Sequence, residues 1–216
     1  MSRPISRRAR QAAETRRDIL DAALRLFAGR GYAATAIADI AAEAGVAVPT
    51  VYASIGAKPL LLKGLLETVD LEAGVPELAQ ALGVATDPRE VLRLAIRITR
   101  QVAERGSTII KVLASAAGSE PEMGQAYAEG LAKHRAGAAA TVGRIAALGA
   151  LSPDVSEADA VAMLATLTDT PVYDGLTRHG WSYDKSETWL FDTLAAQLLR
   201  SRGRPAVPPI SAATAS

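Results

Sequence analysis

The sequence predicts an all-α protein, and two observations support this. Aromatic residues make up only 4% of the 216 residues, and no segment sustains the alternation of apolar and polar residues typical of a half-buried strand. Apolar residues instead recur three and four positions apart along most of the chain, as on the buried face of an amphipathic helix. With 49% hydrophobic residues the chain can also form a substantial core.

The N-terminal end is basic, although the whole chain carries a formal net charge of only +1. Residues 1–66 hold ten Lys and Arg against five Asp and Glu, whereas residues 67–216 hold fourteen against eighteen. The N-terminal excess comes mainly from Arg3, Arg7, Arg8, Arg10, Arg16 and Arg17. We assign residues 1–14 to a basic arm, which is either a solvated tail or a surface for a polyanion.

Capping residues and glycines set the first helices. Thr15 followed by Asp18 predicts the start of a helix over residues 15–29, because a threonine oxygen there accepts a first-turn N–H. This helix ends at the sequence Gly29-Arg30-Gly31. The next two helices are expected over residues 36–44 and 57–73.

The remaining helices follow from the same signals. Asp87, Ser119 and Ser156 each precede an acidic residue that fits the first turn of a helix. The expected helices cover residues 88–105, 107–118, 120–148, 156–179 and 183–200. Residues 201–216 contain three prolines and little to bury, so we expect a disordered tail.

The stretch between the second and third of these helices has helix-turn-helix character. Gly45 stands where a left-handed residue would end the second helix, and Pro49 is acceptable only in the first turn of a new one. In the new helix Val51 and Ile55 should pack inward. The exposed side would then carry Val48, Pro49, Thr50, Tyr52 and Ser54. Taken alone, the same pattern also fits an ordinary connection between two helices.

The surrounding residues resemble the TetR family of bacterial transcriptional regulators. The matching positions are Gly31-Tyr32, Thr35-Ala36, Ile40-Ala41, Ala44-Gly45-Val46, Val51-Tyr52, and Lys58 with Leu60 and Leu61. The resemblance covers residues 15–66 and implies an N-terminal three-helix DNA-binding domain with a helix-turn-helix. It further implies that residues 67–200 form an all-helical effector-binding and dimerisation domain.

The resemblance also implies specific DNA contacts. Tyr52 would contact a backbone phosphate through its hydroxyl, and Lys58 would do so from the start of the next helix, although a core aromatic and a solvated charge are the alternatives. Thr35 would cap the second helix and give its N–H or hydroxyl to phosphate. Arg7, Arg8 and Arg10 would reach the minor groove or the backbone.

The base-reading face departs from the family pattern. Ser54 replaces the usual aromatic or histidine, Ile55 the usual Phe, and Pro49 the usual Gly. Val48, Pro49 and Thr50 offer one hydroxyl and several apolar groups, which suit thymine methyl contacts and shape readout better than guanine recognition. Pro49 either narrows the range of accepted bases or simply starts the helix.

The C-terminal helices should hold a dimer interface and an effector pocket, because a two-fold dimer matches palindromic DNA. The dimer candidates are Val161, Leu164, Leu167, Trp189, Leu190, Leu194 and Leu198. The pocket candidates are Val112, Met123, Tyr127, Leu131, His134, Met163 and Trp181. Each could equally be core. The scarcity of charge among the pocket candidates favours a largely apolar effector.

Other function classes find little support. There is no cysteine, the two histidines have no metal-ligand spacing, and no phosphate loop or catalytic triad pattern occurs, so we expect neither an enzyme, a metal nor a cofactor. No signal peptide or membrane span is expected, which favours the cytoplasm. We therefore predict a DNA-binding regulator, a repressor released by a small molecule. The alternative is a basic helical module that binds DNA without sequence preference, or binds another protein.

Overall fold

The computed structural model describes residues 6–118 and 121–200. These residues form an all-α fold, as the sequence predicts. The helices are α1 (Arg7–Arg30), α2 (Ile37–Glu43), α3 (Val48–Ser54), α4 (Lys58–Glu72), α5 (Val75–Val84), α6 (Pro88–Ala116), α7 (Pro121–Ala147), α8 (Glu157–Leu167), α9 (Thr170–Arg178) and α10 (Tyr183–Leu198).

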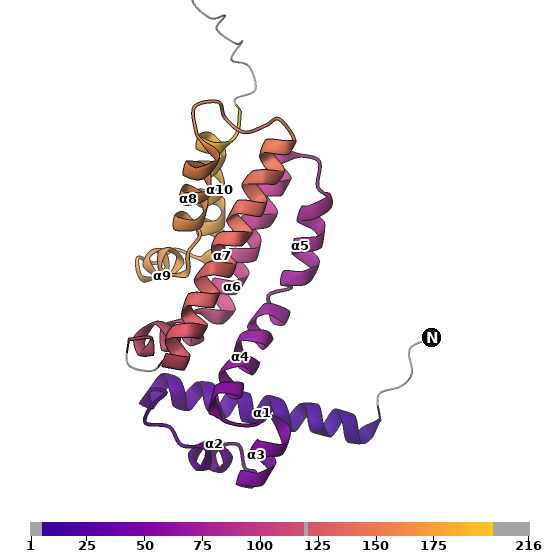
Figure 1. Ribbon diagram of the computed structural model, residues 1–216, viewed down its shortest axis with the longest axis vertical. Helices are drawn as coiled ribbons and strands as arrows, with labels where there is room; N and C mark the ends of the chain where they lie inside the picture. Colours follow the sequence, from indigo (N-terminus) through magenta and orange to yellow (C-terminus); the bar gives the residue numbers. More distant parts are fainter. Residues whose placement is uncertain (1–5, 119–120, 201–216) are drawn as a thin grey trace, which may run out of the picture.

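Two long helices form the centre of the molecule. Helices α6 and α7 run side by side, with α5 along one side and α8, α9 and α10 along the other (Figure 1). Helix α1 lies across one end of this pair, and α2 and α3 lie on its outer side (Figure 1). Helix α4 leads from this end toward α5, so the helix-turn-helix stands at one tip of the molecule.

The core consists of two clusters of buried side chains. The first joins α1 to α4 and includes Ile19, Phe27, Ile40, Val51 and Leu61. It also takes Ile109, Val112 and Leu113 from the end of α6 and Met123 from the start of α7. The second joins the opposite ends of α6 and α7 to α8, α9 and α10. Both long helices therefore contribute to both clusters.

Helix α1 begins earlier than predicted. Its N-cap is Ser6, whose Oγ accepts the Ala9 N–H at 3.2 Å, and Thr15 is an interior residue of the helix. Residues 7–14 consist mostly of arginine and alanine, which are good helix formers, so the helix extends through them. Arg7, Arg8 and Arg10 are thus helical residues of α1, whereas residues 1–5 lie outside the described part.

Two of the predicted boundaries in the C-terminal part are wrong. Helix α6 passes through Gly106 without a break, and a Cβ there would lie 2.8 Å from Cγ1 of Val69, so this glycine permits close packing of α4 on α6. The predicted helix 156–179 is two helices, because Pro171 cannot donate within a helix and the Asp169 carboxylate accepts the Thr170 N–H at 2.8 Å.

The other predicted caps have different outcomes. Asp87 and Ser156 cap α6 and α8, with their side chains accepting from Arg89 N and Asp159 N. Ser119 and the predicted tail 201–216 lie outside the described residues. Helix α5 was not predicted, and it starts with Gly74 in the left-handed region and a proline in the first turn.

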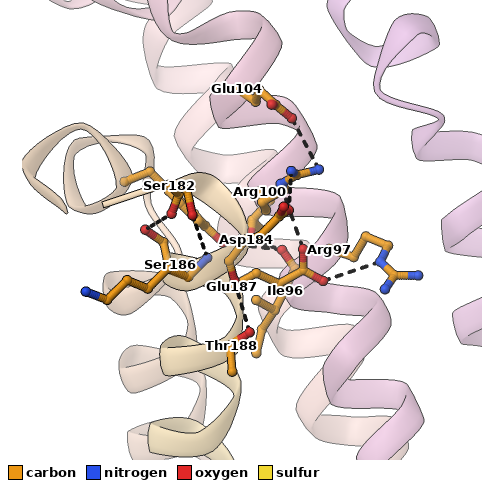
Figure 2. Close-up of polar contacts among 12 residues, drawn as sticks. Ile96, Arg97, Arg100, Glu104, Ser182, Asp184, Ser186, Glu187 and Thr188 are labelled. Carbon is orange, nitrogen blue, oxygen red and sulfur yellow. Dashed lines mark hydrogen bonds and ion pairs between the residues drawn. The ribbon is translucent and has the colours of Figure 1, made fainter. Parts of the chain in front are cut away.

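A polar network ties α6 to α10 (Figure 2). Arg100 lies 2.7 Å from the Asp184 carboxylate and 3.2 Å from that of Glu104, and Glu187 pairs with Arg97 at 3.3 Å. Ser182 caps α10 by accepting the Lys185 N–H at 3.2 Å. These ion pairs fix the packing of α10 on α6, although the buried Arg100 Nε, 3.8 Å from Glu187 Oε2, has no hydrogen-bond partner among the described residues.

Candidate nucleic-acid interface and effector cavity

The turn between α2 and α3 has the predicted geometry. Gly45 has φ of +66°, a left-handed conformation that favours glycine, and the Val46 N–H donates to the Ala41 carbonyl at 2.9 Å. Helix α3 then begins at Val48 with Pro49 in its first turn. The residues Ala44 to Ala47 therefore form a short turn that sets α3 against α2.

Helix α3 presents one face to solvent. Val51 is fully buried in the first core cluster and Ile55 packs against it, as predicted. On the outer side Val48 is 37% exposed and Tyr52 is 53% exposed, so Tyr52 is not a core aromatic. Pro49 is also exposed, whereas Thr50 and Ser54 are half-buried. The accessible reading face is accordingly narrower and more apolar than predicted.

The C-terminal end of α3 is held by Arg16, whose role in the sequence is only that of one of the N-terminal basic residues. Arg16 of α1 donates from Nη1 to the Ser54 carbonyl at 3.2 Å. A cation at this end also complements the helix dipole. Arg16 therefore positions the reading helix, and no local motif could reveal it because 38 positions separate the two residues.

Thr35 does not have either of its predicted roles. The N-cap of α2 is Ala36, whose N–H donates to the Asp39 carboxylate at 3.0 Å. Thr35 is 2% exposed, its hydroxyl donates to the Gly31 carbonyl at 2.8 Å, and its N–H donates to the Tyr32 carbonyl at 3.2 Å. Its polar groups are therefore turned inward, so the predicted contact with phosphate is not supported.

Lys58 stands at the start of α4, as predicted, and it has partners within the protein. Its ammonium lies 4.1 Å from the centre of the Tyr32 ring and 3.4 Å from the Ala33 carbonyl, to which it donates. The ammonium is thus held beside the first turn of α4, where unpaired N–H groups favour an anion.

Three arginines are exposed on the first turns of α1. Arg7, Arg8 and Arg10 have no acidic residue in the same turn, and the N-terminal end of α1 extends past α3 (Figure 1). They are positioned on a helix, so they form a basic surface beside the reading helix.

A large cavity lies behind the DNA-binding helices. It has a volume of about 1080 Å³ and is lined by α4, α5, α6 and α7 with the junction of α8 and α9. The three predicted residues Tyr127, Leu131 and His134 line it from successive turns of α7. Most of the other walls are apolar and include Leu62, Leu66, Val69, Ile98, Val102, Ile110 and Leu113.

Most charged groups around the cavity, Lys63 apart, have partners among the described residues. Lys133 pairs with Asp70, and Arg144 donates two hydrogen bonds to the Ala85 carbonyl at 2.9 and 3.2 Å. His134 Nε2 is 2.8 Å from the Ala165 carbonyl. A carbonyl only accepts, so Nε2 must carry the hydrogen, and Nδ1 is the acceptor in the neutral ring.

The other four pocket candidates do not line the cavity. Val112 and Met123 belong to the first core cluster, where Met123 is fully buried. Met163 is 38% exposed on α8, and Trp181 packs edge-on against Trp189 with ring centres 5.9 Å apart. Helical spacing alone could not separate these positions from the residues that face the cavity.

The dimer candidates divide between the core and the surface. Leu164, Leu190, Leu194 and Leu198 are buried in the second core cluster, so they are core residues of the single chain. Val161 and Leu167 are half-buried, and Trp189 is 39% exposed. Only the last three leave surface for a second copy.

Comparison with known proteins finds a family match over the helix-turn-helix segment. The family model described as "Bacterial regulatory proteins, tetR family" matches residues 19–58, which include the turn and all of α3. Residues 19–58 of this chain are therefore similar to the TetR family. The chain is also 37% identical over 83 residues to the HTH-type transcriptional regulator AcrR of Shigella flexneri. That match covers 38% of the chain and 39% of the length of AcrR.

Solved structures have the same fold as this chain. A transcriptional regulator from Saccharomonospora viridis in complex with choline has a TM-score of 0.68 at 23% identity, with 88% of this chain and 100% of that chain covered. NalD, the secondary repressor of the MexAB-OprM multidrug efflux pump in Pseudomonas aeruginosa, has a TM-score of 0.70 at 21% identity, with 89% and 100% covered. The SmeT–triclosan complex has a TM-score of 0.71 at 20% identity, with 87% and 92% covered.

Two further properties bear on the function. AcrR and the Saccharomonospora viridis protein are named as transcriptional regulators, and NalD is named as a repressor. Within residues 6–118 and 121–200, no helix is both long and apolar enough to cross a bilayer, and no group of three or more His, Asp or Glu residues is arranged to hold a metal ion.

Proposed function

We propose that this protein is a sequence-specific DNA-binding transcriptional regulator, a repressor that a small molecule releases from its operator. The observation that carries the proposal is the helix-turn-helix formed by α2 and α3. Helix α3 stands at the tip of the molecule with Val48, Pro49 and Tyr52 exposed, and this geometry suits entry into the major groove.

The groups around α3 support contacts with the DNA backbone. Tyr52 would place its hydroxyl against a phosphate, and Lys58 would add its charge beside the first turn of α4. Arg7, Arg8 and Arg10 would extend the contact along the neighbouring backbone or minor groove. Base recognition would then come from the apolar face of α3, through thymine methyl groups and DNA shape.

The proposed repressor acts as a homodimer on a palindromic operator in the cytoplasm. One chain has one reading helix, whereas a two-fold dimer reads two half-sites about 34–36 Å apart or a multiple of that distance. Val161, Leu167 and Trp189 are available for the interface on α8 and α10.

The cavity supports a small, largely apolar effector. A volume of about 1080 Å³ is at the upper end of the range for small-molecule sites, and most of its charged lining groups, such as Lys133, Asp70 and Arg144, are already paired. Two similar structures contain choline and triclosan, which are both small organic molecules. Binding would favour a conformation with weaker operator affinity.

Selection of bound sequences from random DNA tests the proposal. The purified full chain should enrich a two-fold symmetric site, which we call the operator, and should bind it at least about a thousandfold more tightly than unrelated DNA. Salt-dependent binding with no enriched site would instead support the nonspecific basic module. A screen of metabolites and drugs for release from the operator would then identify the effector.

A further inference from the structure

The first turn of α7 contacts the DNA-binding helices directly. The hydroxyl of Tyr32, in the loop between α1 and α2, donates to the Glu122 carboxylate at 3.3 Å. The next residue, Met123, is fully buried in the core cluster that α1 to α4 share. Helix α7 is therefore anchored to the DNA-binding helices by this hydrogen bond and by Met123, and Ala126 and Tyr127 pack against the same cluster.

Tyr32 connects this contact to a phosphate-binding candidate. The Tyr32 ring packs in the core, and its centre lies 5.1 Å from that of the Phe27 ring. Only 5% of Tyr32 is exposed. The ammonium of Lys58 lies 4.1 Å from the same ring. A displacement of the Tyr32 ring would therefore displace the charge at the start of α4.

The same helix forms a wall of the cavity. Glu122 lies at the edge of the cavity, and Tyr127 and Leu131 line it one and two turns further along. Helix α7 is unbroken from Pro121 to Ala147, so a force on its cavity face also moves its first turn. Farther along, His134 is bonded to the Ala165 carbonyl of α8, which holds that part of the helix in place.

We propose that Glu122 is the positioning residue through which an occupied cavity weakens DNA binding. The inference rests on the proposed function and names the contact that transmits the effector signal. In the empty protein the Glu122–Tyr32 hydrogen bond holds the Tyr32 ring, and the ring holds Lys58 at the phosphate site. An occupant that pushes α7 outward breaks this hydrogen bond and shifts the Tyr32 ring, and the Lys58 ammonium that rests on the ring shifts with it while it keeps its hydrogen bond to Ala33.

The geometry makes this contact sensitive to small movements. Hydrogen bonds between two oxygens usually span about 2.5–3.0 Å. The Tyr32–Glu122 distance of 3.3 Å is longer than that range, so this hydrogen bond is weak and yields more readily than the buried contacts of the cluster.

A side chain built into the cavity can stand in for the unidentified effector. Gly130 is an exposed residue of the cavity wall, and a Cβ placed there meets no atom within 4 Å, so Gly130→Phe adds a ring at this wall without a clash of its Cβ. Gly137→Phe is a second occupant of the same kind. We would measure operator affinity for each filling variant, alone and combined with Tyr32→Phe or Glu122→Ala. Tyr32→Phe keeps the ring that Lys58 contacts and removes only the hydroxyl.

The inference predicts effects that do not add. Filling the cavity of the otherwise wild-type protein should weaken operator binding about tenfold, within the usual range of allosteric coupling. Tyr32→Phe and Glu122→Ala should each weaken operator binding to a similar extent. In either of these variants, filling the cavity should lower operator affinity by less than about a further twofold. Glu157→Ala, which removes a first-turn glutamate of α8 away from the cavity, is the matched control and should keep the full tenfold response.

Two results would overturn the inference in distinguishable ways. If filling the cavity lowers operator affinity about tenfold in Tyr32→Phe and Glu122→Ala as well, the effector signal does not pass through Glu122. The proposed function as a regulator would be unaffected by that result. If both filling variants fold, as thermal unfolding would report, yet bind the operator like wild type, the cavity does not control DNA binding. That second result would also remove the effector from the proposed function, while the selected operator would still establish a DNA-binding protein.

Discussion

The hydrogen bond from Arg16 to the Ser54 carbonyl should matter for operator affinity and not for its salt dependence. We consider the variant Arg16→Met, which keeps much of the apolar stem and removes the guanidinium. Arg16 is half-buried, and its Nη1 lies 3.2 Å from the carbonyl at the end of the seven-residue helix α3. So short a helix depends on outside contacts for its position.

The size of the effect follows from that contact. A hydrogen bond from a charged donor contributes about 1.5–3 kcal/mol, and partial exposure of Arg16 places it near the lower end. Without this hydrogen bond, the C-terminal end of α3 becomes ordered only when DNA binds. The free energy needed to order it therefore lowers the operator affinity. About 1.5 kcal/mol corresponds to slightly more than a tenfold loss of operator affinity for each reading helix.

Titrations at several salt concentrations separate positioning from phosphate contact. Each phosphate contact contributes about 0.9 to the slope of log affinity against log salt concentration, so Arg16→Met should leave the slope unchanged. Arg25→Met is the control, because Arg25 forms only an exposed pair with Glu43 at 3.0 Å, worth about 0–1 kcal/mol. A slope reduced by about one per subunit would show that Arg16 contacts DNA instead, and an unchanged affinity would refute the argument altogether.

Three further predictions concern the reading face and the core. Val48→Ala and Thr50→Ala should change the preference among operator variants in a binding competition; a uniform loss of affinity would contradict thymine methyl readout. Gly106→Ala should lower the unfolding free energy by about 1–3 kcal/mol in denaturant titrations, because its Cβ would lie 2.8 Å from a Val69 methyl, whereas Gly143→Ala, with open space, should raise it by about 0.5–1 kcal/mol. Burial raises the pKa of Tyr173 above its usual value, so the unfolded chain loses this proton first and stability should fall as the pH rises above about 10. Tyr173→Phe should show a smaller fall in urea titrations between pH 9 and 11, and an identical fall would exclude Tyr173 as a source.

Local sequence signals predicted the helix-turn-helix of α2 and α3 well. Gly45 and Pro49 impose backbone conformations that few other residues tolerate, so the turn and the start of α3 follow from them alone. Val51 was placed inside correctly because helical periodicity was combined with that known start. The family resemblance added Tyr52 and Lys58 at positions that the structure leaves at the surface or at the start of α4.

Contacts between distant segments explain what the sequence could not reveal. Gly106 has the signature of a helix end, yet its role is set by Val69, more than thirty positions away. Thr35 matches a capping pattern, but its hydroxyl is taken by the Gly31 carbonyl once the loop closes. Met123 shares its helical face with residues that line the cavity, and only the packing of α7 on α1 to α4 distinguishes them.

The shared first core cluster has a consequence for modularity. Although residues 15–66 contain all the positions that resemble the TetR family, the first core cluster beneath them is completed by Ile109, Val112, Leu113 and Met123. A chimera that grafts this reading head onto another regulator's body would lose those four side chains unless the recipient supplies equivalents. The DNA-binding helices α1 to α4 should therefore be transferable only together with the end of α6 and the start of α7. In packing terms, these two helix ends belong to the DNA-binding domain.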